Sequence, residues 1–185
     1  EKYRIYGTST NMLNMNKLGL LPTRNYQEGV FEFAELVSGE YLDEHHKVKV
    51  IARAQCPIAC EQMSMVKTGP FAGAMTGIEY ECLQAVSSNC GINDMTAAIR
   101  LVDVADRSGM DAMSMGVTIS YTMECYERGV LKKEDLICDR APEGIELNFG
   151  NGPDAVTLAQ MIETREGIGD TLAECTKRAS QPFDQ

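Results

Sequence analysis

The sequence contains no tryptophan, and only 5 phenylalanines and 7 tyrosines occur among its 185 residues. It has no run of about 18 apolar residues, which argues against a transmembrane helix and against a membrane partner. Residues 1–10 lack the basic and apolar segments of a secretory signal peptide, so we expect a cytoplasmic protein. Because the sequence also lacks an initiator methionine, we expect it to be a piece of a longer chain.

Basic residues are scarce. The 17 lysines and arginines are outnumbered by 27 acidic residues, which gives a net charge of −10. The basic residues form no cluster and do not alternate with aromatic residues. A protein that binds nucleic acid needs a positive surface to meet the phosphates. The charge pattern therefore predicts no nucleic-acid partner.

Helical periodicity is the main pattern that is present. Between residues 93 and 109 the apolar residues are spaced by 3, 1, 3 and 3, which predicts a helix capped by Asn93 and ended by Gly109. A second helix begins with Asp111 as its cap and stops at Gly129. Further helices are expected at 9–19, 30–39, 78–88, 153–167 and 170–180.

The fold class that follows is an all-α, multihelical domain, with room for one small strand pair. Residues 47–53 (KVKVIAR) alternate and are the best strand candidate. The 11 methionines, in the absence of tryptophan, indicate a helical core filled by flexible side chains. The length of 185 residues favours a single domain over residues 1–185.

Two of the seven cysteines, Cys56 and Cys60, stand four residues apart in the segment IARAQCPIACEQ. On a helix such residues share a face, so both thiolates could bind one metal ion. Two thiolates do not complete a site that needs four ligands, and Arg53 stands three residues before Cys56. Spacing alone leaves two interpretations open, a metal site or a pair of packed thiols.

A second candidate site is the junction Asp106-x-x-Gly109-Met110-Asp111. Gly109 can turn the chain with a positive φ, and Asp111 can cap the next helix. The Asp106 carboxylate beside this turn could accept two parallel N–H bonds from a planar group such as a pterin ring. The alternative is an ordinary junction between two helices.

A third candidate lies in GIEYECLQAVSSNCG, where Glu79 and Glu81 precede an apolar helix. A carboxylate near a core can have a raised pKa and act as a general acid or base. The alternative is that one or both face solvent or cap the helix.

Taken together and in this order, six segments resemble the tungsten-containing aldehyde ferredoxin oxidoreductase family. They are LPTRNYQEG…AELVSGEYL, CPIAC, GIEYECLQAVSSNCGI, DRSGMDAMSMG…MECYERGVL, LNFGN and REGIGDTLAE. The resemblance implies the first of two helical domains that follow an N-terminal β-rich domain and close over a bis-pterin cofactor with tungsten (or molybdenum). We expect those other domains to lie outside this sequence and to pack against it.

The resemblance also assigns roles to residues. Asp106, Gly109 and Asp111 match a pterin-binding motif in which Met110 replaces the usual leucine. Glu81, with Glu79 as second choice, corresponds to a glutamate close to the metal.

The same resemblance concerns an iron–sulfur cluster. Cys56 and Cys60 match the second and third cysteines of the Cys-x-x-Cys-x-x-x-Cys pattern that holds a [4Fe–4S] cluster, with a fourth cysteine from the last domain. Arg53 stands where the first should be. A guanidinium cannot bind iron, so this replacement puts the cluster in doubt.

The function implied is the oxidation of aldehydes to carboxylic acids, with electrons passed through the cluster to ferredoxin. We expect the isolated piece to be inactive and to form a homo-oligomer through surface that its neighbours would cover. One alternative is a reductase of aromatic acyl-CoA thioesters (the benzoyl-CoA type) with the same cofactor. Another is a non-catalytic paralogue or subunit that has lost the cluster.

Overall fold

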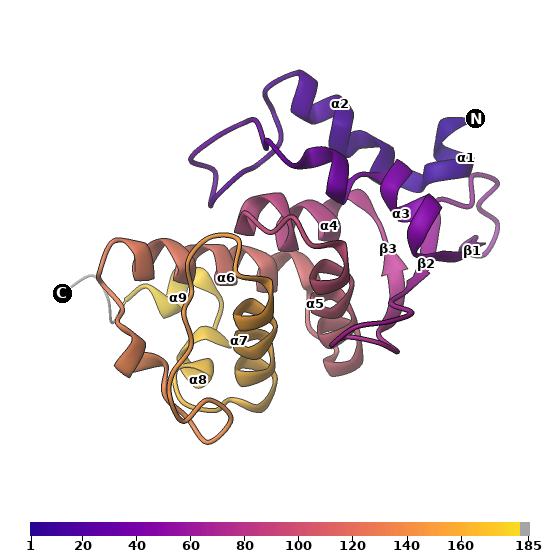
Figure 1. Ribbon diagram of the computed structural model, residues 1–185. Helices are drawn as coiled ribbons and strands as arrows, with labels where there is room; N and C mark the ends of the chain where they lie inside the picture. Colours follow the sequence, from indigo (N-terminus) through magenta and orange to yellow (C-terminus); the bar gives the residue numbers. More distant parts are fainter. Residues whose placement is uncertain (182–185) are drawn as a thin grey trace.

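The computed structural model describes residues 1–181 and places helix α5 (Met95–Ser108) at the centre of the molecule (Figure 1). This helix packs against α4 (Tyr80–Val86), α7 (Gly152–Thr164) and strand β3 (Met75–Ile78). Helix α6 (Ala112–Glu127) follows α5 after a short turn and packs along α4. The central helix therefore joins a small sheet on one side to the C-terminal helices on the other.

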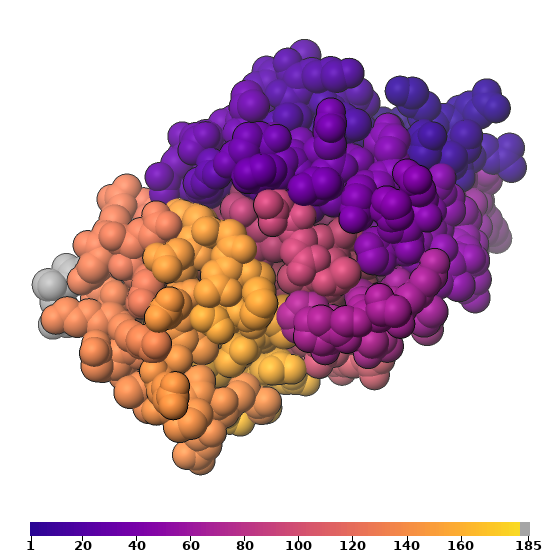
Figure 2. All heavy atoms as spheres, viewed as in Figure 1, coloured from indigo at the N-terminus to yellow at the C-terminus, as the bar shows by residue number. Residues whose placement is uncertain are grey.

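Shorter elements surround this centre. The remaining α-helices are α1 (Lys2–Tyr6), α2 (Asn11–Lys17), α3 (Gly39–His45), α8 (Gly169–Leu172) and α9 (Thr176–Ala179). In the described part of the chain, residues 1–181, four 3₁₀ turns lie at Gly7–Thr10, Ala34–Val37, Ser88–Cys90 and Lys133–Leu136. In the space-filling view, the middle of the chain is visible between the N-terminal part and the C-terminal part (Figure 2). No helix within residues 1–181 is long and apolar enough to cross a bilayer.

The prediction of an all-α domain is only partly right, because the protein is helix-rich but contains a three-stranded antiparallel sheet. Its order is β1 (Lys47–Ile51), β2 (Glu61–Met65) and β3, with Gln62 opposite Ile78. The strand predicted at 47–53 is confirmed as β1. The sheet is thus one strand larger than the strand pair that the sequence allowed.

In the other two strands most of the buried positions hold polar residues, which explains why the sequence did not reveal them. In β2 the buried positions are Gln62 and Ser64, and in β3 one of the two buried positions is Thr76. Tertiary packing, and not hydrophobic patterning, therefore fixes these strands.

Several helix predictions were wrong in extent or type. The helix predicted at 30–39 is only a 3₁₀ turn at Ala34–Val37, and the helix predicted at 78–88 begins at Tyr80 because Ile78 ends β3. Gly39 begins helix α3 and does not end a helix, because Ser38 caps it by accepting the Tyr41 N–H at 3.1 Å. Asp94, and not Asn93, caps α5 and accepts the Thr96 N–H at 2.8 Å. The helix predicted at 170–180 is interrupted at Cys175, where φ is +65°.

Methionine contributes to the core as the composition predicted. The buried methionines are Met12, Met95, Met115, Met123 and Met161.

Candidate active site

The turn between α5 and α6 has the geometry predicted for it. Gly109 ends α5 in the left-handed region with φ +68°, a conformation that costs glycine little. Asp111 caps α6, and its Oδ2 accepts the Ser114 N–H at 2.7 Å. The turn therefore fixes the backbone between Asp106 and Asp111. As a result, the carboxylates of these two residues lie close to the same turn.

Asp106 is positioned by the sheet as well as by its helix. The Thr76 hydroxyl on β3 donates a short hydrogen bond to Asp106 Oδ2. This contact joins residues that are 30 positions apart, so no local pattern could have predicted it. Since an ionised carboxylate offers about four lone-pair sites, Asp106 keeps acceptor capacity for a ligand.

The structure brings four of the predicted site residues together. Glu79, Glu81, Asp106 and Asp111 all line one pocket with a volume of about 290 Å³. The remaining lining residues are Arg53, Glu61, Gly77, Cys82, Val102, Ala112 and Met113. We call this space the acidic pocket, because within residues 1–181 five carboxylates line it and Arg53 is the one cation that does so.

Burial and neighbouring charges together shift the pKa of Glu79. Its pKa is raised above the ordinary value of 4.5, first by burial and then by the charges of Glu61 and Glu81, while Arg53 acts in the opposite direction. By contrast, the hydrogen bonds from Ser114 lower the pKa of Asp111. The pocket therefore combines a carboxyl group that holds its proton more readily with a carboxylate that stays ionised.

A half-buried thiol, Cys82, lies at the start of α4, beside Glu79. Cys82 Sγ lies 3.1 Å from the Glu79 carbonyl oxygen, to which it donates, and burial raises the pKa of Cys82 to about 11. The thiol is thus protonated at neutral pH and holds the backbone of Glu79 in place.

The cysteine loop runs between β1 and β2 and contains Cys56 and Cys60, both half-buried. The Cys56 N–H donates to the Arg53 carbonyl at 3.0 Å, which closes a turn. Burial, followed by the charge of Glu79, raises the pKa of Cys60. Within residues 1–181 no group of three or more Cys, His, Asp or Glu side chains is arranged to hold a metal ion.

These residues do not fit a [4Fe–4S] cluster by themselves, since such a cluster takes four thiolates. Arg53, at the position of the missing cysteine, instead places its Nε 3.2 Å from Glu61 Oε2. The arginine thereby lines the acidic pocket. Cys56 and Cys60 as cluster ligands remain a prediction.

Sequence reasoning missed Glu61, Gly77 and Thr76 as parts of the site. A Cβ atom on Gly77 would lie 2.3 Å from Glu61 Oε1, so the glycine leaves room for that carboxylate. These contacts depend on the register of β2 and β3, which the sequence did not reveal.

The acidic pocket suits a group rich in N–H donors better than it suits an anion, because carboxylates dominate its polar lining. The two motif carboxylates, Asp106 and Asp111, lie on either side of the Gly109 turn and can accept from such donors. The residues present therefore fit the pterin part of the predicted cofactor.

The fold has been observed before in a solved structure. The structure resembles a chain of the active site complex BamBC of benzoyl coenzyme A reductase, solved in complex with 1,5 dienoyl-CoA, with a TM-score of 0.70. The two chains are 18% identical, and the match covers 98% of this chain and 25% of that one. At this identity the likeness concerns the fold alone.

The sequence makes the assignment more specific. Residues 1–185 match the family described as aldehyde ferredoxin oxidoreductase, domains 2 and 3, and the chain belongs to this family. The resemblance inferred from the motifs is thereby confirmed.

Individual relatives agree with this assignment. Over 179 residues the chain is 38% identical to a tungsten-containing aldehyde ferredoxin oxidoreductase from Pyrococcus abyssi, covering 97% of this chain and 28% of that protein. It is 32% identical over 160 residues to an aliphatic sulfonate oxidoreductase, WOR-like subunit, from Pyrococcus furiosus, covering 86% of this chain and 24% of that protein. The chain thus spans about a quarter of the length of these relatives.

Proposed function

We propose that this chain forms part of a tungsten–pterin oxidoreductase that converts aldehydes to carboxylic acids. The observation that carries the proposal is the acidic pocket, in which Glu79, Glu81, Asp106 and Asp111 line one space although 32 positions separate the first from the last. Motif residues that are distant in sequence and meet in one pocket are typical of a functional site.

The cofactor side of the pocket is the turn at Gly109. We infer that Asp106 and Asp111 would accept hydrogen bonds from the N–H groups of a pterin, with Thr76 orienting Asp106. The name of the 38% identical relative supports tungsten as the metal, with molybdenum as the alternative. When bound, the cofactor would supply the metal centre that takes up two electrons from the substrate.

The substrate side is formed by Glu79 and Glu81. Oxidation of an aldehyde with water gives a carboxylic acid, two electrons and two protons, so a nearby base is needed. The raised pKa of Glu79 brings its proton exchange closer to neutral pH, which suits a general base that must later release the proton. Glu81, the more exposed of the two, is the other candidate for this base.

The route by which electrons leave is a separate question. Ferredoxin as the acceptor follows from the family resemblance. Cys56 and Cys60 alone do not supply the four thiolates of a complete cluster.

A second candidate is the reduction of aromatic acyl-CoA thioesters by the same kind of site. The fold likeness to the BamBC complex, with a TM-score of 0.70, favours keeping this alternative. A sulfonate oxidoreductase among the relatives indicates that substrates vary within the family. A non-catalytic role is less well supported, because the acidic pocket keeps all four predicted carboxylates.

The proposal is tested by turnover of the full-length protein with an aldehyde and a ferredoxin or dye acceptor. We expect the variant of the glutamate that acts as the general base, Glu79→Gln or Glu81→Gln, to lower kcat by roughly 10²–10⁴-fold, the usual contribution of such a base. Glu163→Gln, at an exposed glutamate on α7, removes a carboxylate away from the pocket and should leave kcat unchanged. Full turnover in both pocket variants would overturn the proposal.

A further inference from the structure

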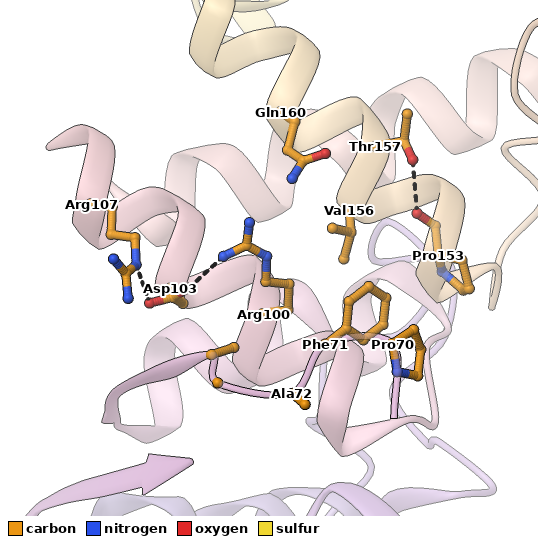
Figure 3. A pocket seen from close by; sticks show the side chains of 12 residues that line it. Pro70, Phe71, Ala72, Arg100, Asp103, Arg107, Pro153, Val156, Thr157 and Gln160 are labelled. Atoms are coloured by element: carbon orange, nitrogen blue, oxygen red, sulfur yellow. Dashed lines mark hydrogen bonds and ion pairs between the residues drawn. The ribbon is translucent and has the colours of Figure 1, made fainter. Parts of the chain in front are cut away.

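We propose that a second, larger pocket on another face of α5 binds an organic anion with an aromatic or similarly flat apolar body. This pocket lies between residues 70–74, α5 and α7, and its volume is about 640 Å³ (Figure 3). That volume is within the usual range for small-molecule sites. Among the residues that the structure describes, it shares no lining residue with the acidic pocket, so a ligand bound here would be distinct from a ligand bound there.

The polar side of this pocket is built on a buried carboxylate. Asp103 is 1% exposed, and its two oxygens accept hydrogen bonds from two arginines one helical turn on either side. Arg100 Nη1 lies 2.6 Å from Asp103 Oδ2, and Arg107 Nε lies 2.7 Å from Asp103 Oδ1. Each arginine commits one nitrogen to these bonds, so the remaining N–H groups of both guanidinium groups are left as donors.

The charge balance of this pocket is opposite to that of the whole chain. The sequence carries a net charge of −10, yet two guanidinium groups and a single carboxylate line this cavity. Asp103 offsets one positive charge and holds both arginines in position. One positive charge remains beside the cavity, and a carboxylate or phosphate group is the partner that two guanidinium groups recognise.

The opposite wall is apolar and indicates the shape of the ligand. Pro70, Phe71, Pro153 and Val156 form this side, and Figure 3 shows the Phe71 ring beside the two prolines. Such a surface favours a flat apolar body, which burial and ring contacts would stabilise.

A polar group lies near the arginines as well. The Gln160 amide on α7 extends toward Arg100 in Figure 3 and adds a further donor or acceptor. The ligand class that fits both walls is therefore an aromatic carboxylate or an aromatic phosphate ester.

The test is calorimetric titration of the full-length protein with benzoate and with phenyl phosphate. We expect saturable binding of at least one of the two compounds. The compound that binds more tightly shows whether the pocket prefers a carboxylate or a phosphate. Arg100→Gln and Arg107→Gln should each weaken that binding at least tenfold, while Asp103 keeps one arginine partner in either variant. Phe71→Ala should weaken binding of the aromatic anion and leave the affinity for inorganic phosphate unchanged.

Two controls make the result decisive. Arg140→Gln removes a comparably exposed arginine that pairs with Glu166 outside the pocket, and it should leave affinity unchanged. Benzyl alcohol, which has the ring without the charge, should bind at least tenfold more weakly. The proposal is overturned if neither anion binds, if benzyl alcohol binds equally well, or if Arg140→Gln weakens binding as much as Arg100→Gln.

Discussion

The immediate neighbours of individual carboxylates in the acidic pocket shift their pKa values in opposite directions. Asp111 accepts hydrogen bonds at the start of α6, which lower its pKa, whereas Glu79 is partly desolvated beside Glu61 and Glu81, which raise its pKa. Arg53 is the cation that moderates this repulsion. Arg53 stands where the family pattern has a cysteine. It therefore removes one possible cluster ligand from the loop and adds a positive charge to the adjacent pocket.

The ionisation of Glu79 should lower the free energy of unfolding as the pH rises. Because its pKa is higher in the folded than in the unfolded state, the folded protein loses stability as the pH rises above the ordinary value of 4.5. Glu79→Gln removes this ionisation. Urea unfolding should therefore give equal stability for the variant and the wild type near pH 4 and a more stable variant at pH 7.

Glu163→Gln provides the matched control for this measurement, since it removes an exposed carboxylate from α7. A stability difference between Glu79→Gln and the wild type that does not change with pH would contradict the assignment of a raised pKa to Glu79.

At the scale of elements, the turn at Gly109 joins α5 to α6 and carries two residues of the acidic pocket, Asp106 and Asp111. Gly109 and Gly129 follow the two long helices, with φ of +68° and +71°, and a Cβ atom would meet nothing within 4 Å at either position. Alanine at either glycine is therefore disfavoured by backbone conformation alone.

We predict that Gly109→Ala and Gly129→Ala each lower the free energy of unfolding by about 1–2 kcal/mol. Only Gly109→Ala should also lower the pterin content of the full-length protein, because only this turn carries Asp106 and Asp111. Chemical unfolding and pterin analysis measure the two effects. Equal pterin loss in both variants would show that the Gly109 turn has no special role.

The features that the sequence could predict are those that depend on residues close together in the chain, whereas features that depend on distant residues could not be predicted. The end of α5 at Gly109 and the cap at Asp111 were predicted because each depends on a few adjacent residues. Strands β2 and β3 were missed, since polar side chains such as Gln62 and Thr76 fill their buried positions. The pairing of Thr76 with Asp106 depends on those strands, so it could not be predicted either.

At the scale of the whole molecule, helix α5 separates two pockets of opposite character. Asp106 and Val102 line the acidic pocket, while Arg100, Asp103 and Arg107 line the larger one. Several apolar side chains are also exposed on the N-terminal part, among them Leu18, Leu20, Val30 and Phe33. This exposure is consistent with the prediction of an oligomer or of contacts with further domains, which stays a prediction.

The central claim is that the acidic pocket holds one pterin of a tungsten or molybdenum cofactor. It is tested most directly by metal analysis of the full-length protein, purified without oxygen, for tungsten, molybdenum and iron. We predict about one tungsten or molybdenum per chain in the wild type. Asp139→Asn, which changes an exposed aspartate, is the control and should keep that metal. Asp106→Asn should lose most of it while its circular dichroism spectrum stays unchanged. Wild-type protein without either metal, or Asp106→Asn with a full complement, would contradict the claim.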